Sequence, residues 1–129
     1  MSRIIKFRAW RKSTGWADEV TVYGDGSWSA KFGDIEGYDA DDGVVLMEWT
    51  GFRDTQGKEI WEGDIVRINH PADLTGDFTN AVGDVFWWDE EGGWYHGNNH
   101  GRPPKRMWEY VEVIGNIYEH PELLEEVKQ

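Results

Sequence analysis

The sequence predicts a mostly-β fold, namely a small SH3-like barrel or sandwich of short antiparallel strands with an N-terminal β extension and a short C-terminal helix. Nine Trp, five Tyr and five Phe supply large rings that suit half-buried, pleated surfaces. Sixteen glycines suit tight turns rather than long helices. The third observation is the alternation of short apolar runs with Gly- and Asp-rich segments, most regular over 59–96.

The first half of the chain carries strand and hairpin signals. Residues 4–10 alternate between apolar and polar side chains, which predicts a strand. Val20–Tyr23 and Ser27–Phe32 flank the sequence Gly-Asp-Gly, so we expect a hairpin there, because Asp-Gly supplies the positive φ angles of a tight turn. Residues 33–43 are rich in Gly and Asp, and they are predicted to form a loop.

The second half repeats the pattern with larger side chains. Turns are expected at Asp54–Lys58 and at Asp89–Gly93, the latter leading into an aromatic strand, Trp94–His96. Loops are expected over 70–80 and 97–106. The remaining strands are predicted at Val44–Thr50, Ile65–Asn69, Ala81–Trp88 and Trp108–Val113.

A short helix is expected after Pro121, because proline is favoured at the first helical position and Glu122 suits the positive end of the helix dipole. The domain organisation we predict is an N-terminal β-strand region, 1–50, packed on an SH3-like barrel region, 51–129, that includes this helix. One single domain over 1–129 is the alternative, since 129 residues suffice for one core.

The charge distribution limits the partners. The formal net charge is −12, and no Lys or Arg occurs between Arg67 and Arg102. DNA binding depends on Lys and Arg neutralising phosphates, so this balance argues against nucleic acid as the general partner. Such an acidic surface confers solubility, or it engages a basic partner. Five basic residues without any acid in 1–12 are the exception to this balance.

No segment predicts catalysis, a cofactor or a metal. His96 and His100 have a zinc-like spacing, but the intervening Gly-Asn-Asn argues against a helix, so we expect solvated loop histidines. Residues 39–43 resemble a calcium loop with its glycine one place too early. Phosphate-binding glycine loops and nucleophile-elbow serines are missing from the sequence. We therefore expect a protein that is not an enzyme and binds no cofactor or metal.

Three sequence blocks resemble the YopX family. They are IKFRAW at 5–10, MEWTGFRDTQGKEIWEGDIV at 47–66 and EVIGNIYEHPELL at 112–124. The resemblance implies a mostly-β protein of phage or prophage origin, of unknown biochemical function. It also implies action in the bacterial cytoplasm, which agrees with the lack of cysteine and of any apolar run of about 20 residues.

These blocks also have a structural interpretation. Gly51, Gly57, Gly63 and Gly115 are predicted at positions that need a positive φ or a close backbone approach. Asp54 and Asp64 are predicted to accept hydrogen bonds from nearby backbone N–H groups in turns. The predicted core comprises Ile5, Phe7, Leu46, Ile60, Ile65, Val66, Val113, Ile114 and Ile117.

The aromatic hairpin is the candidate partner-binding site. Successive side chains on a strand alternate between faces, so Trp87 and Trp88 cannot both enter one core. Aromatic side chains outside a core are typical of protein interfaces. We therefore predict a non-catalytic module that binds an unknown host or phage protein, and no membrane. The candidate residues are Trp87, Trp88, Asp89, Glu90, Glu91, Trp94 and Tyr95.

Other functions stay open at this point. One alternative is a nucleic-acid-binding protein that uses the basic N-terminal strand, the exposed aromatic rings and the cations of 102–106. Another is a DNA-mimic inhibitor, which requires the acids to cluster on one face. A small hydrolase has the weakest support. Homo-oligomerisation through the apolar tail residues Leu123, Leu124 and Val127 is also open.

Overall fold

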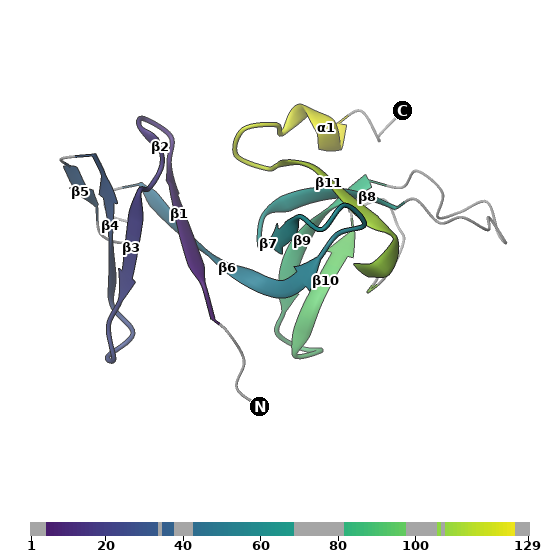
Figure 1. Cartoon of the computed structure of the whole chain (residues 1–129), viewed down its shortest axis with the longest axis horizontal. Coiled ribbons are helices and arrows are strands. Elements are labelled where there is room, and N and C mark those ends of the chain that lie inside the picture. Colours follow the sequence, from purple (N-terminus) through teal and green to yellow (C-terminus); the bar gives the residue numbers. More distant parts are fainter. Residues whose placement is uncertain are drawn as a thin grey trace, which may run out of the picture. The chain divides into compact units, whose positions relative to one another are not determined.

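The computed structural model describes residues 5–33, 35–37, 43–68, 82–97, 106 and 108–125. Strands dominate these residues and the α-helix is a single short one, which confirms the predicted fold class (Figure 1). The elements in chain order are β1 Phe7–Arg11, β2 Gly15–Trp16, β3 Glu19–Val22, β4 Trp28–Phe32, β5 Ile35–Gly37, β6 Val44–Arg53, β7 Glu59–Trp61, β8 Asp64–Ile68, β9 Val82–Trp88, β10 Gly93–Gly97, the 3-10 turn η2 Trp108–Tyr110, β11 Val111–Asn116 and α1 Glu122–Glu125.

The strands form antiparallel sheets in the described part of the chain. Their orders are β2-β1-β6-β7, β10-β9-β8-β11 and β3-β4-β5. Contacts divide the chain into two compact units, Met1–Trp49 and Thr50–Gln129. The predicted packing of an N-terminal region on the rest stays a prediction.

The first unit is built around a small apolar cluster. Its buried members are Ala9, Ala30, Phe32 and Val44. The predicted hairpin is present as β3 and β4, with Val22 opposite Trp28. Its turn is closed by the Tyr23 N–H, which donates to the Ser27 carbonyl at 2.8 Å.

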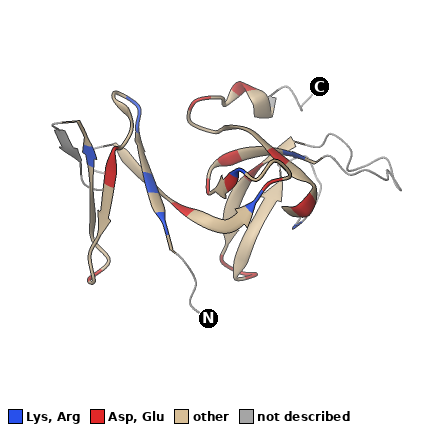
Figure 2. Cartoon of the chain, viewed as in Figure 1, with Lys and Arg blue, Asp and Glu red and all other residues tan. Residues whose placement is uncertain are grey.

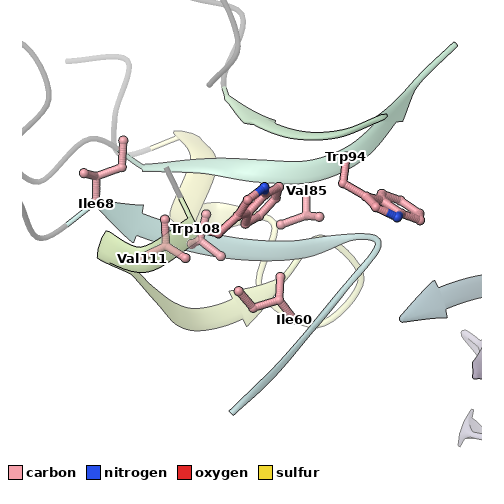
Figure 3. Close-up of a cluster of buried hydrophobic side chains, with 7 residues drawn as sticks. Ile60, Ile68, Val85, Trp94, Trp108 and Val111 are labelled. Atoms are coloured by element: carbon pink, nitrogen blue, oxygen red, sulfur yellow. The ribbon is translucent and has the colours of Figure 1, made fainter. Parts of the chain in front are cut away.

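The second unit has the larger core, formed between β7, β8, β9, β10, η2 and β11. Seven buried side chains make one cluster, namely Ile60, Val66, Ile68, Val85, Trp94, Trp108 and Val111. Figure 3 shows Ile68 at one end of this cluster and Trp94 at the other. The position of Trp94 brings the core up to the β9–β10 hairpin.

Two carboxylates hold the turns of the second unit, as predicted. Asp54 Oδ1 accepts from the Gln56 and Lys58 N–H groups at 2.9 and 2.8 Å. Asp64 Oδ2 accepts from the Trp61 N–H at 2.8 Å. Both carboxylates are buried, so their role is in the framework. The nearby turn glycines confirm the other part of the prediction, since Gly57 and Gly63 have φ of 82° and 86°.

Some predicted elements and core positions were wrong. Strand β5 lies within the predicted loop 33–43, because it extends the β3–β4 hairpin by a third strand. Trp108–Tyr110 is a 3-10 turn rather than the start of a strand, and this conformation buries Trp108. Ile5 is 58% exposed because it precedes β1, although it was predicted in the core.

The other predicted core and loop positions have different outcomes. Ile60, Ile65 and Val66 are buried as predicted, whereas Phe7, Leu46, Val113, Ile114 and Ile117 are partly buried. Gly97 belongs to β10 and not to the predicted loop. Residues 39–42, 70–80 and 98–105, together with Val127, lie outside the described residues.

Candidate functional site: the β9–β10 hairpin

The hairpin of β9 and β10 is closed by a tight acidic turn. The Trp88 carbonyl accepts from the Glu91 and Gly92 N–H groups at 3.2 and 2.8 Å. Gly92 has a φ of 65°, a left-handed conformation that favours glycine. Trp87 pairs with Trp94, and Trp88 pairs with Gly93. This register puts Trp87 and Trp88 on opposite faces of the hairpin, as the alternation of side chains predicts.

One face of the hairpin carries Trp87 and Trp94. Their rings meet edge to face, with centroids 5.2 Å apart and planes at 77°. Trp94 belongs to the core cluster and is 7% exposed, whereas Trp87 is 43% exposed. Both point to the core side of the sheet, since Trp87 shares a face with Val85, but Trp87 lies near the strand end and next to the turn. Trp87 is therefore a partly exposed ring that packs against a buried ring.

The other face carries a second aromatic group with a cation. Trp88 and Tyr95 meet edge to face at 5.0 Å, and the Phe86 ring lies 6.5 Å from the Trp88 ring. The Arg106 guanidinium lies 5.3 Å from the centroid of Tyr95. All three rings are partly buried. Tyr95 and Trp88 therefore shield each other and present less ring surface than Trp87 does.

The turn brings three carboxylates beside these rings. Asp89, Glu90 and Glu91 are exposed, and Figure 2 shows the turn between β9 and β10 as an acidic tip. Within the described part of the chain, their side chains make no ion pair or hydrogen bond. The hairpin thus combines an exposed indole with negative charge that the described residues do not neutralise.

His96 is buried rather than solvated, so the predicted loop position was wrong. It is 2% exposed, lies in β10 opposite Val85, and meets the Trp108 ring edge to face at 4.9 Å. The strand continues one residue beyond it, which sequence reasoning had assigned to a loop. Among the described residues, no group of three His, Cys, Asp or Glu side chains is placed to hold a metal ion. His100 lies outside the described residues.

Sequence reasoning missed two features of the aromatic core. Trp108 stacks on Phe52 with centroids 5.2 Å apart and planes at 10°. The Nε1–H groups of Trp94 and Trp108 are buried and have no hydrogen-bond acceptor among the described residues. The only signal for these residues was the high tryptophan content, which does not say which rings enter the core.

The cations of the N-terminal strand contact aromatic rings. Lys6 Nζ lies 4.3 Å from the Trp49 ring centroid, and the Arg8 guanidinium lies 4.4 Å from that of Trp16. Arg11 lies over Phe32 at 4.8 Å. These cation–π contacts are within the distance at which they are attractive. These cations, among the blue segments in Figure 2, therefore have a structural use within their own unit.

Residues 6–125 match the YopX protein family. The chain belongs to this family. The crystal structure of protein EF1440 from Enterococcus faecalis resembles this chain with a TM-score of 0.63 and 25% identity, over 95% of this chain and 99% of that one. None of the curated proteins matches this chain. Among the described residues, no helix has the length and apolar character needed to cross a membrane.

The central block that resembles the family has a structural role in this chain. Residues 47–66 contain both turn carboxylates, Asp54 and Asp64, and the glycines at positive φ. These residues support the fold. The β9–β10 hairpin lies outside all three blocks but within the family match over 6–125.

Proposed function

We propose that this YopX-family chain is a non-catalytic protein-binding module, encoded by a phage or prophage and acting in the bacterial cytoplasm. The proposal is carried by one observation: Trp87 is 43% exposed and is separated by one residue from a turn of three carboxylates, which have no counter-charges among the described residues. Tryptophan is enriched among the few residues that carry most of the energy of protein interfaces.

The architecture of the hairpin supports this use. The Trp94 ring packs edge to face against the Trp87 ring and restricts its rotation. Little conformational freedom is therefore lost when Trp87 enters a partner's pocket. The exposed carboxylates of Asp89, Glu90 and Glu91 follow this ring in the adjoining turn. Charges of this kind steer association with a surface of opposite sign. The partner that fits is a host or phage protein with a basic surface.

The nucleic-acid alternative has less support. Lys6, Arg8 and Arg11 lie over aromatic rings of their own unit, which competes with their use on phosphates. The DNA-mimic alternative loses two of its acids, because Asp54 and Asp64 are buried in turns. No observation on the described residues favours self-association through the apolar C-terminal residues.

The experiment is a capture from bacterial and phage-infected lysates with the full chain, with and without nuclease, followed by mass spectrometry. We expect one nuclease-resistant partner that is retained by wild type and lost with Trp87→Ala. Tyr23→Ala is the matched control, because Tyr23 is an aromatic residue of similar exposure, 50%, in the turn of the β3–β4 hairpin. A partner retained equally by both variants would contradict the hairpin as the binding surface, and loss with nuclease would favour nucleic acid.

A further inference from the structure

We infer that Trp87 and the acidic turn form a receptor for an arginine side chain of the partner. The inference rests on the proposed function and specifies its chemistry. A guanidinium stacked on the open part of the Trp87 ring would reach the carboxylates of Asp89, Glu90 and Glu91, which have no ion pair among the described residues.

The ring and the charges are close to each other along the chain. Asp89 follows Trp87 by two residues, and a strand advances about 3.3 Å per residue, so the turn begins about 7 Å along the strand from Trp87. The bonds from the Glu91 and Gly92 N–H groups to the Trp88 carbonyl fold the turn back beside the strand end. An arginine side chain spans such a distance with its aliphatic stem on the indole.

Arginine suits this site better than lysine. Its planar guanidinium stacks on aromatic rings and donates two parallel hydrogen bonds to a carboxylate, whereas lysine offers a compact, strongly hydrated charge. The chain uses the same chemistry within itself, where Arg8 lies 4.4 Å from Trp16 and Arg106 lies 5.3 Å from Tyr95. At Trp87 the ring and the acids are present, and none of the described residues places a cation there, so we assign the cation to the partner.

The β3–β4 hairpin is a natural comparison within the same chain. It also presents an exposed ring, Tyr23, beside a turn with an acid, Asp25. There the Oδ1 atom of Asp25 accepts from the Ser27 N–H at 2.9 Å and from the Ser27 hydroxyl at 2.6 Å. One acid already occupied by its own turn makes a poor counter-ion, so we assign no receptor to this hairpin.

The test is a titration of the ¹⁵N-labelled full chain, observed through the indole N–H resonances of its tryptophans. The probes are three capped tripeptides with a central arginine, lysine or citrulline between glycines, where citrulline keeps the shape of arginine without its charge. The Trp87 resonance is assigned as the one missing from Trp87→Phe. We expect the arginine peptide to shift it saturably, the lysine peptide to bind about two- to fivefold more weakly, and the citrulline peptide to have no effect.

Variants of the turn separate the charges from the ring. The double variant Glu90→Gln/Glu91→Gln should abolish saturation by the arginine peptide, whereas Asp25→Asn in the other hairpin should leave the titration unchanged. Both substitutions lie in exposed turns, and a thermal melt verifies that each variant is folded. Equal shifts by the arginine and citrulline peptides, or an unchanged titration in the double variant, would overturn the inference.

The two proposals can fail separately. Trp87-dependent capture of a protein without any response to the arginine peptide would sink the arginine receptor and leave the binding module standing. A response to the arginine peptide without Trp87-dependent capture would contradict the protein-binding module and leave the arginine site on the hairpin standing.

Discussion

Asp54 illustrates how one short side chain joins parts of the chain that are far apart in sequence. Its Oδ1 atom organises the turn before β7, and its Oδ2 atom accepts from the Val113 N–H of β11 at 2.9 Å. Thr55 adds a backbone bond from its N–H to the Val111 carbonyl at 3.0 Å. The turn is thus tied to a strand that the chain forms more than fifty residues later.

Replacing Asp54 with alanine should be strongly destabilising. Three backbone donors, those of Gln56, Lys58 and Val113, would lose a charged acceptor, and each such bond contributes about 1.5–3 kcal/mol. We expect Asp54→Ala to lower the free energy of unfolding by about 3 kcal/mol or more in urea titrations. Asp54→Asn keeps one acceptor oxygen and should cost less. Equal stability of Asp54→Ala and wild type would contradict the role of this carboxylate.

Asp84 in β9 should destabilise the protein at neutral pH. Burial raises the pKa of its carboxyl above the ordinary 3.8, so the native state holds its proton more tightly than the unfolded chain does. The resulting stabilisation is complete below 3.8 and is lost as pH rises through the higher native pKa. We expect Asp84→Asn to raise the melting temperature at pH 7, with a difference that shrinks toward pH 3.

Asp25 provides a control of opposite sign for that measurement. The hydroxyl and N–H of Ser27 hydrogen-bond its carboxylate and lower its pKa below 3.8. The stabilisation from Asp25 is therefore present at neutral pH and is lost as pH falls through the lowered native pKa. Asp25→Asn should lower the melting temperature at pH 7. The same direction of change in both variants would contradict these assignments.

At the scale of elements, the close approach of β9 and β10 depends on glycine. A Cβ added to Gly83 would lie 2.5 Å from the carbonyl carbon of Gly97, which is backbone and cannot move aside. Gly83 also pairs with Val66 in the neighbouring strand β8. The inner strands of this sheet therefore need a residue without a side chain at this position.

Gly83→Ala should consequently lower the free energy of unfolding by about 1–3 kcal/mol, the usual cost of overpacking. Gly24→Ala is the matched control, because a Cβ at Gly24 would meet nothing within 4 Å and its φ lies outside the left-handed region. Thermal denaturation of the two variants compares the sites directly. Destabilisation of equal size in both would contradict the contact with Gly97 as the cause, because the effect of alanine on the unfolded chain is stabilising.

At the scale of the whole molecule, the two units differ in how much core they contain. The cluster in Thr50–Gln129 includes two tryptophans and has the turns of Asp54 and Asp64 within the same unit. Among the described residues of Met1–Trp49, the cluster has four buried members, of which two are alanines. Small domains are marginal because they bury a small fraction of their surface.

We therefore expect the fragment 50–129 to fold alone and the fragment 1–49 to remain unfolded alone. Circular dichroism and amide NMR dispersion of the two fragments, compared with the full chain, provide the measurement. Retention of the Trp94 indole N–H resonance position in fragment 50–129 would show that its core is native. An unfolded 50–129 fragment would contradict the prediction and favour a single domain over 1–129.

The sequence by itself determined the periodic and local features of this protein. Alternation and Gly-Asp turns predicted the β3–β4 hairpin, the acidic turn of the β9–β10 hairpin and the carboxylate turns at Asp54 and Asp64, because each of these depends on neighbours within a few residues. The three blocks indicated the YopX family, which the match over 6–125 then confirmed. The composition likewise indicated an aromatic core.

The tertiary structure alone decided which aromatic rings are covered and what surrounds them. Trp87 and Trp94 face the same side of the hairpin, yet one is exposed and the other buried, because Trp94 lies over the core cluster and Trp87 lies next to the turn. His96 was predicted in solvent and is buried against Trp108, twelve residues later. Such outcomes depend on contacts between strands distant in sequence, and periodicity carries no information about how far a core extends along a strand.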